Sequence, residues 1–123
     1  MSFLDDKNLS KILSRNQHAD LINLSGSDIE NKKILITGSE GSLGQELIKR
    51  LSNNLDVQIL RTDIIGDVEF MDVTKISQVT KIVEKFSPDL IFHLAGAKHA
   101  PVGEVETKET FEINTIGTFN MLE

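Results

Sequence analysis

The amino-acid sequence predicts an α/β protein with a doubly wound parallel sheet. Short apolar segments typical of strands alternate with longer segments whose apolar residues recur at helical spacing. Such alternation is typical of strand–helix–strand units with right-handed crossovers, in which the strands run parallel. The segment 90–95 is a nearly continuous apolar run, as in a parallel strand covered on both faces. The length of 123 residues corresponds to one domain.

The expected elements divide the chain into two parts. Residues 1–31 are predicted to form a helical appendage and a loop, and residues 32–123 a domain that is incomplete at its C-terminus. Within this domain we expect about four strands, in the order 3-2-1-4 across the sheet. The predicted strands span 34–36, 57–60, 68–71 and 90–95. Thr74 is expected to cap the helix that ends at Phe86, and a last helical pattern is still running at Glu123.

The most informative motif spans Lys33–Gly44, where a short strand runs into three glycines and then a helix. Gly38 suits a tight turn, Gly41 a close approach of phosphate, and Gly44 the packing of helix against strand. Free backbone N–H groups at the helix start favour an anionic pyrophosphate. We therefore predict a Rossmann-like dinucleotide site, with a glycine-rich turn that binds nothing as the alternative. The expected contacts from this motif are Gly38, Gly41, Ser42, Leu43 and Gly44.

Asp63 ends the second predicted strand, beside the first. A carboxylate at that place accepts hydrogen bonds from the adenosine ribose and repels a 2′-phosphate, which favours NAD over NADP. Arg61 weakens this preference, because a guanidinium near the ribose accommodates the phosphate. The alternative is that Asp63 only forms a turn. Glu40 brings negative charge into the glycine loop, and we expect its side chain to point to solvent.

Two further segments are candidates for cofactor contact. Asp72 and Val73 follow the third strand, where an acceptor beside an apolar side chain suits adenine; equally, Asp72 helps to cap the next helix. Small residues end the fourth strand, where the backbone has to approach the cofactor closely. These residues are Leu94, Ala95 and Gly96.

The three histidines do not make a metal site, because His18, His93 and His99 are scattered along the chain. His93 lies within an apolar strand, and we interpret it as a hydrogen-bonded core residue rather than a catalytic one. His99 belongs to the loop above the fourth strand, where active sites of open α/β sheets form.

Composition excludes several other classes. The formal charge is −6, without a basic cluster, so nucleic acid and anionic membranes are poor partners. The absence of cysteine excludes disulfides, thiolate metal sites and a thiol nucleophile. No signal peptide and no apolar run long enough for a membrane span are found, so a cytoplasmic location is expected.

Together these residues resemble the extended short-chain dehydrogenase/reductase superfamily, whose fingerprint Thr-Gly-x-x-Gly-x-x-Gly stands at Thr37–Gly44. The segment His93–Glu104 is similar to the Lys-His-Val-Pro region of polysaccharide-biosynthesis UDP-N-acetylglucosamine 4,6-dehydratases and related epimerases. Ala100 and Gly103 depart from that pattern. The superfamily's Asn-x-x-Gly-Thr pattern follows at Asn114–Thr118, and the resemblance covers roughly residues 29–123.

The resemblance implies roles for two residues. Lys98 would face the nicotinamide and the sugar, and it would also contact the cofactor. Asn114 matches an asparagine that helps to order the catalytic water network. His99 and Glu104 belong to the family pattern without an assignable role.

The resemblance also implies the chemistry of a lyase: oxidation of the sugar by hydride transfer, elimination of water, and return of the hydride. Its base comes from a Tyr-x-x-x-Lys segment or a variant, downstream of the matched region. This chain contains no tyrosine. We therefore expect the NAD(P)-binding N-terminal part of such an enzyme, catalytically incomplete alone, which meets a UDP-sugar only with the missing C-terminal part. The alternative is a non-catalytic dinucleotide-binding module that acts through a partner chain.

A last expectation concerns the strand at 90–95. In a complete fold of this type a fifth strand pairs with its far side. An unpaired strand edge recruits other strands. We expect this chain to self-associate there or to need a partner chain.

Overall fold

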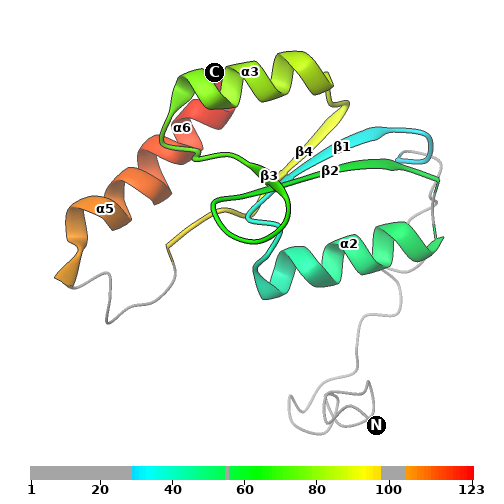
Figure 1. Ribbon diagram of the computed structural model, residues 1–123, viewed down its shortest axis with the longest axis horizontal. Coiled ribbons are helices and arrows are strands. Elements are labelled where there is room, and N and C mark those ends of the chain that lie inside the picture. Colours follow the sequence, from blue (N-terminus) through cyan, green and yellow to red (C-terminus); the bar gives the residue numbers. More distant parts are fainter. Residues whose placement is uncertain (1–28, 55, 98–104) are drawn as a thin grey trace, which may run out of the picture.

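The computed structural model describes residues 29–54, 56–97 and 105–123. Four parallel strands form one sheet in the order β3-β2-β1-β4, which confirms the predicted order (Figure 1). The strands are β1 (Lys33–Thr37), β2 (Gln58–Asp63), β3 (Glu69–Phe70) and β4 (Leu90–His93). Helix α2 (Ser42–Asn54) lies on one side of the sheet, and α3 (Ile76–Phe86) and α6 (Gly117–Leu122) lie on the other.

Strand β1 is the centre of the core. Ile34, Leu35 and Ile36 are all fully buried. Because side chains alternate along a strand, Ile34 and Ile36 pack with Leu51 of α2, whereas Leu35 packs with Val79 of α3 on the opposite face. Burial of each such side chain stabilises the fold by about 1.5–3 kcal/mol. The continuous apolar run of β1 is therefore explained by helices on both faces.

Helix α3 follows the predicted apolar spacing but not the predicted cap. The residue before its first turn is Lys75, which makes no side-chain cap hydrogen bond. Thr74 instead donates its hydroxyl to Asp72 Oδ1 over 2.7 Å, so the expected threonine cap is wrong. The helix ends as predicted before Pro88, with Ser87 in a left-handed conformation (φ 50°) donating its N–H to Val83 O.

Strand β4 is shorter than predicted, because it ends at His93 and not at Ala95. Among the described residues it pairs with β1 alone, so its other edge lies at the border of the sheet. Ile91 on this strand is 39% exposed. The expected self-association through this edge stays a prediction.

The last helical segment is divided into three parts: α5 (Thr107–Phe111), a π-helical turn η3 (Glu112–Ile116) and α6. Of the apolar residues that predicted the helical pattern, Ile113 is partly buried, whereas Phe111, Phe119 and Leu122 are more than half exposed. The segment packs on the core through Met121, and beside it through small and polar residues. A Cβ atom on Gly117 would lie 2.6 Å from Val73 Cγ2, and Asn120 donates its side-chain N–H to Val73 O over 2.9 Å.

Candidate functional site

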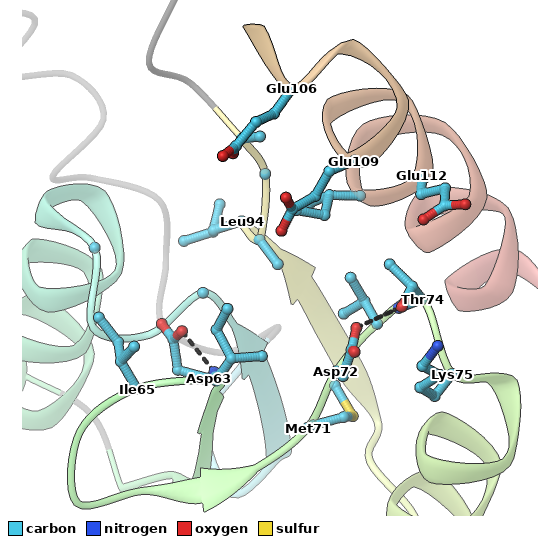
Figure 2. Close-up of a pocket in the computed structure, with 18 of the residues that line it drawn as sticks. Asp63, Ile65, Met71, Asp72, Thr74, Lys75, Leu94, Glu106, Glu109 and Glu112 are labelled. Atoms are coloured by element: carbon cyan, nitrogen blue, oxygen red, sulfur yellow. Dashed lines mark hydrogen bonds between the residues drawn. The ribbon is translucent and has the colours of Figure 1, made fainter. Parts of the chain in front are cut away.

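A cavity of about 1030 Å³ opens at the carboxyl ends of the strands (Figure 2). The glycine loop, the end of β2, the turn after β3, the end of β4 and the α5–η3 segment all contribute to its walls. Most of the predicted cofactor contacts line it. They are Gly38, Gly41, Asp63, Asp72, Val73, Leu94, Ala95 and Gly96. Open α/β sheets bind their ligands at this edge.

The glycine loop is shaped by two close backbone approaches. Gly38 has a φ of +66°, and a Cβ atom there would lie 2.6 Å from the backbone nitrogen of Ala95. A Cβ atom on Gly44 would lie 2.7 Å from Gly38 O. The turn expected for Gly38 is therefore confirmed, and Gly44 packs the start of α2 against the loop itself.

The first turn of α2 faces the loop with unpaired donors. The first backbone hydrogen bond into the helix runs from Gln45 N–H to Gly41 O over 3.0 Å. The N–H groups of Ser42, Leu43 and Gly44 precede it and have no intrahelical acceptor. No acidic residue lies in this turn, so the positive end of the helix dipole is not offset there. Leu43 has a side chain that is 66% exposed, so only its backbone is a candidate contact.

Asp63 is fixed at the mouth of the cavity by two backbone donors. Its Oδ2 accepts the N–H of Glu40 over 2.9 Å, and its Oδ1 accepts the N–H of Ile64 over 2.7 Å. The carboxylate therefore joins β2 to the glycine loop, as the turn alternative expects. Each carboxylate oxygen has two acceptor sites, so both keep capacity for a further donor.

The side chain of Glu40 does not point to solvent, and that expectation is wrong. It forms an ion pair with Arg61 and is only 18% exposed. The cause lies in the strand alternation of β2, which places Arg61 and Asp63 on the same face, beneath the glycine loop. Gly66 (φ +82°) closes over the pair, because a Cβ atom there would lie 2.8 Å from Glu40 Oε2.

Asp72 both lines the cavity and organises the turn before α3. Its Oδ1 accepts the N–H of Thr74 over 2.9 Å in addition to the threonine hydroxyl. Its own N–H donates to Gln78 Oε1 over 2.9 Å. The side chain thus shapes the entry to the helix, and a role in adenine recognition stays a prediction.

Comparison with known proteins identifies the class of protein to which this site belongs. The model of the family described as "NAD dependent epimerase/dehydratase family" matches residues 34–123. The chain belongs to this family. Its members are NAD(P)-dependent, which confirms the expected cofactor class and agrees with the resemblance to the short-chain dehydrogenase/reductase superfamily.

Individual relatives of this epimerase/dehydratase chain include enzymes of sugar-nucleotide metabolism. GDP-6-deoxy-D-talose 4-dehydrogenase of Aggregatibacter actinomycetemcomitans is 36% identical over 90 residues, 73% of this chain and 29% of that protein. The probable polysaccharide biosynthesis protein EpsC of Bacillus subtilis is 26% identical, over 81% of this chain and 20% of its own length. The chain therefore spans less than a third of these two relatives.

A solved structure supports the same assignment. The dTDP-4-dehydrorhamnose reductase of Bacillus anthracis, solved in complex with NADP, is 30% identical with a TM-score of 0.63. The match covers 74% of this epimerase/dehydratase chain and 31% of that reductase.

Thr37, the first residue of the family fingerprint, is a hydrogen-bond hub that sequence reasoning missed. Its Oγ1 accepts the N–H groups of Leu94 and Ala95, each over 3.1 Å, and lies 2.7 Å from His93 Nδ1. With both lone pairs in use, the hydroxyl donates to Nδ1. His93 therefore carries its proton on Nε2 and donates to Thr118 Oγ1, 3.1 Å away. This order confirms that His93 is hydrogen-bonded through both ring nitrogens, in a partly buried position on β4.

Burial lowers the pKa of His93 below its usual value of 6.5. The unfolded chain then binds more protons than the folded one as the pH falls below about 6.5, so stability decreases on acidification. We expect the unfolding free energy of the native chain to decrease more between pH 7.5 and 5.5 than that of His93→Gln. Urea titrations at several pH values measure this difference. Parallel pH profiles for the two chains would contradict the assignment.

Asn114 lies in η3 and holds the segment after β4. Its Oδ1 accepts the N–H of Ala97 over 2.7 Å, and its Nδ2 donates to Ala97 O over 2.9 Å. The side chain thus fixes the backbone beside Gly96, whose added Cβ would lie 3.2 Å from Oδ1. The water-ordering role implied by the resemblance stays a prediction. Lys98, His99 and Glu104 lie outside the described residues.

The described residues hold neither a metal-ligand cluster nor a membrane-spanning helix. Among residues 29–54, 56–97 and 105–123, no three His, Cys, Asp or Glu side chains gather in a metal-binding arrangement. Within these ranges no helix combines the length and the apolar character that a membrane crossing requires.

Proposed function

We propose that this chain is the NAD(P)-binding part of a nucleotide-sugar epimerase or dehydratase of polysaccharide biosynthesis. The observation that carries the proposal is that the glycine loop, through Gly38 and Gly41, and the Asp63 carboxylate line one cavity, directly before the first turn of α2. The kinds of reaction named for the relatives, among them the B. subtilis polysaccharide biosynthesis protein, support the sugar-nucleotide class.

The groups around the cavity fit a dinucleotide in size and in donor chemistry. Its volume of about 1030 Å³ lies just above the range of about 300–1,000 Å³ for small-molecule sites. The N–H groups of Ser42, Leu43 and Gly44 would hold the pyrophosphate. Asp63 would accept from the adenosine ribose, and Asp72 and Val73 would contact adenine.

The end of β4 would support the nicotinamide. Leu94, Ala95 and Gly96 line the cavity there, and Thr37 fixes the N–H groups of the first two. By the resemblance to the superfamily, Lys98 would face the nicotinamide and the sugar. When bound, the nicotinamide supplies reversible hydride acceptance. The chain's own residues bind and orient it.

The remaining catalytic groups are proposed to come from outside these 123 residues. The chain contains no tyrosine and therefore no Tyr-x-x-x-Lys segment. General-base catalysis requires a side chain within hydrogen-bond reach of the sugar hydroxyl. Turnover is therefore expected only when a sugar-binding part is present.

Calorimetric titration with NADH tests cofactor binding directly. We expect measurable binding by the native chain and at least a tenfold loss in Gly41→Val. Gly41 lines the cavity, so a valine side chain there would occupy the space that the phosphate needs. Because Gly41 does not have a positive φ, valine can adopt its backbone conformation.

The matched control for that titration is Ser52→Val, an exposed substitution on α2 itself. It is expected to bind NADH like the native chain. No binding by the native chain at millimolar NADH, or equal binding by Gly41→Val, would refute the proposal.

A further inference from the structure

Two carboxylates line the place where the adenosine ribose would lie, and one guanidinium lies behind them. Asp63 accepts the N–H of Glu40, and the side chain of Glu40 pairs with Arg61. The loop at Gly66 covers the Glu40 carboxylate. The ribose end of the site is therefore built from residues of both the glycine loop and β2.

Glu40 lies between Arg61 and the cavity. The described lining residues include Glu40 and Asp63 but not Arg61. Figure 2 shows Asp63 at the cavity wall beside the Ile65 loop. Arg61 is placed one strand repeat further back on the same face of β2, with a side chain that is 40% exposed.

A guanidinium near the ribose normally accommodates the 2′-phosphate of NADP. Here the charge of Arg61 is already matched by Glu40. Within the described chain, the Nε of Arg61 is buried without a hydrogen-bond partner, so the guanidinium keeps one unused N–H donor. A 2′-phosphate would meet the carboxylates of Glu40 and Asp63 before it reached the arginine, and like charges at short range repel.

We propose that Glu40 is a specificity-determining residue, which occupies Arg61 and excludes the 2′-phosphate so that the site selects NAD(H). This inference rests on the proposed dinucleotide binding. It assigns the choice of cofactor to Glu40 as well as to Asp63. Arg61 could bind a phosphate, but in the native chain its guanidinium is paired with Glu40 instead. Removing the Glu40 charge frees the guanidinium to meet a phosphate at the cavity edge.

Fluorescence titrations of the native chain and of Glu40→Gln with NADH and NADPH test the inference. We expect the native chain to bind NADH at least tenfold more tightly than NADPH. In Glu40→Gln, NADPH binding strengthens at least tenfold while NADH binding changes less than threefold. Arg61→Gln added to Glu40→Gln abolishes the gain. Glu84→Gln, an exposed change of equal charge on α3, leaves both affinities unchanged.

Arg61→Gln alone provides a second test that does not depend on the Glu40 variant folding. Because Glu40 already occupies the guanidinium, we expect the NADH-to-NADPH ratio to stay within threefold of the native one. A native preference for NADPH, or a loss of NADPH binding in Arg61→Gln, would overturn the inference. So would a Glu40→Gln chain that keeps the native ratio while still binding NADH. Failure of the native chain to bind either dinucleotide would refute the proposed function and this inference together.

Discussion

Gly38→Ala is expected to lose at least about 4 kcal/mol of unfolding free energy, a large part of the about 5–15 kcal/mol typical of a native domain. A left-handed conformation costs a non-glycine residue about 1–3 kcal/mol. The added methyl group would also lie 2.6–2.8 Å from backbone atoms of Leu94 and Ala95. Those atoms cannot move away freely, because Thr37 holds both N–H groups. Urea denaturation followed by circular dichroism measures the loss.

The matched control is Gly41→Ala in the same loop. Gly41 does not have a positive φ, so alanine there is expected to cost no more than about 1 kcal/mol. A Gly38→Ala chain as stable as Gly41→Ala would show that the loop does not have the left-handed turn described for it.

Thr37→Val is expected to cost about 2–4 kcal/mol, although the two side chains have nearly the same shape. The substitution leaves Ala95 N–H and His93 Nδ1, both in partly buried hydrogen bonds, without partners, and an unsatisfied buried group costs about 1–3 kcal/mol. Leu94 N–H keeps its backbone partner, Thr37 O, at 3.1 Å. Thermal and urea unfolding of the variant measure the total.

Thr37→Ser separates the hydroxyl from the methyl group. Serine keeps all three hydrogen bonds and loses one methyl, for which about 1 kcal/mol is expected. Equal destabilisation by Thr37→Val and Thr37→Ser would contradict the role of Thr37 as a hydrogen-bond hub, because the hydroxyl would then contribute nothing to the unfolding free energy.

Much of the fold followed from local patterns in the sequence. The strand-to-glycine-to-helix order predicted β1, the glycine loop and α2, and strand–helix alternation predicted the parallel order β3-β2-β1-β4. These patterns predict well because one physical cause, burial on both faces of a sheet, determines both the apolar runs and the topology.

Side-chain placement was less predictable, because it depends on contacts distant in sequence. Glu40 was expected in solvent, but Arg61 lies 21 positions away on the strand beneath it. The alternation of Arg61 and Asp63 on one face of β2 was a signal that could have predicted the ion pair. The role of Thr37 had a weaker signal, a threonine between an apolar strand and the first glycine.

Side-chain placement was also hard to predict in the last helical segment, on the side of the sheet opposite α2. Its apolar residues suggested the inner face, yet Phe119 is 57% exposed and Asn120 is buried. Asn120 binds Val73 O, a carbonyl in the turn before α3, and Gly117 allows the close approach. A packing face in which a glycine and an asparagine are the most buried residues, beside Met121, cannot be recognised from hydrophobic periodicity.

Backbone amide chemical shifts during an NADH titration test the central claim, that a dinucleotide binds at the carboxyl edge of this sheet. We predict that the largest changes occur at the amides of the α2 first turn, Ser42, Leu43 and Gly44, followed by Ile64, Val73 and Gly96. Changes centred instead on the groove formed by Glu69, Phe70, Gln78 and Lys81, or no changes at millimolar NADH, would contradict the claim.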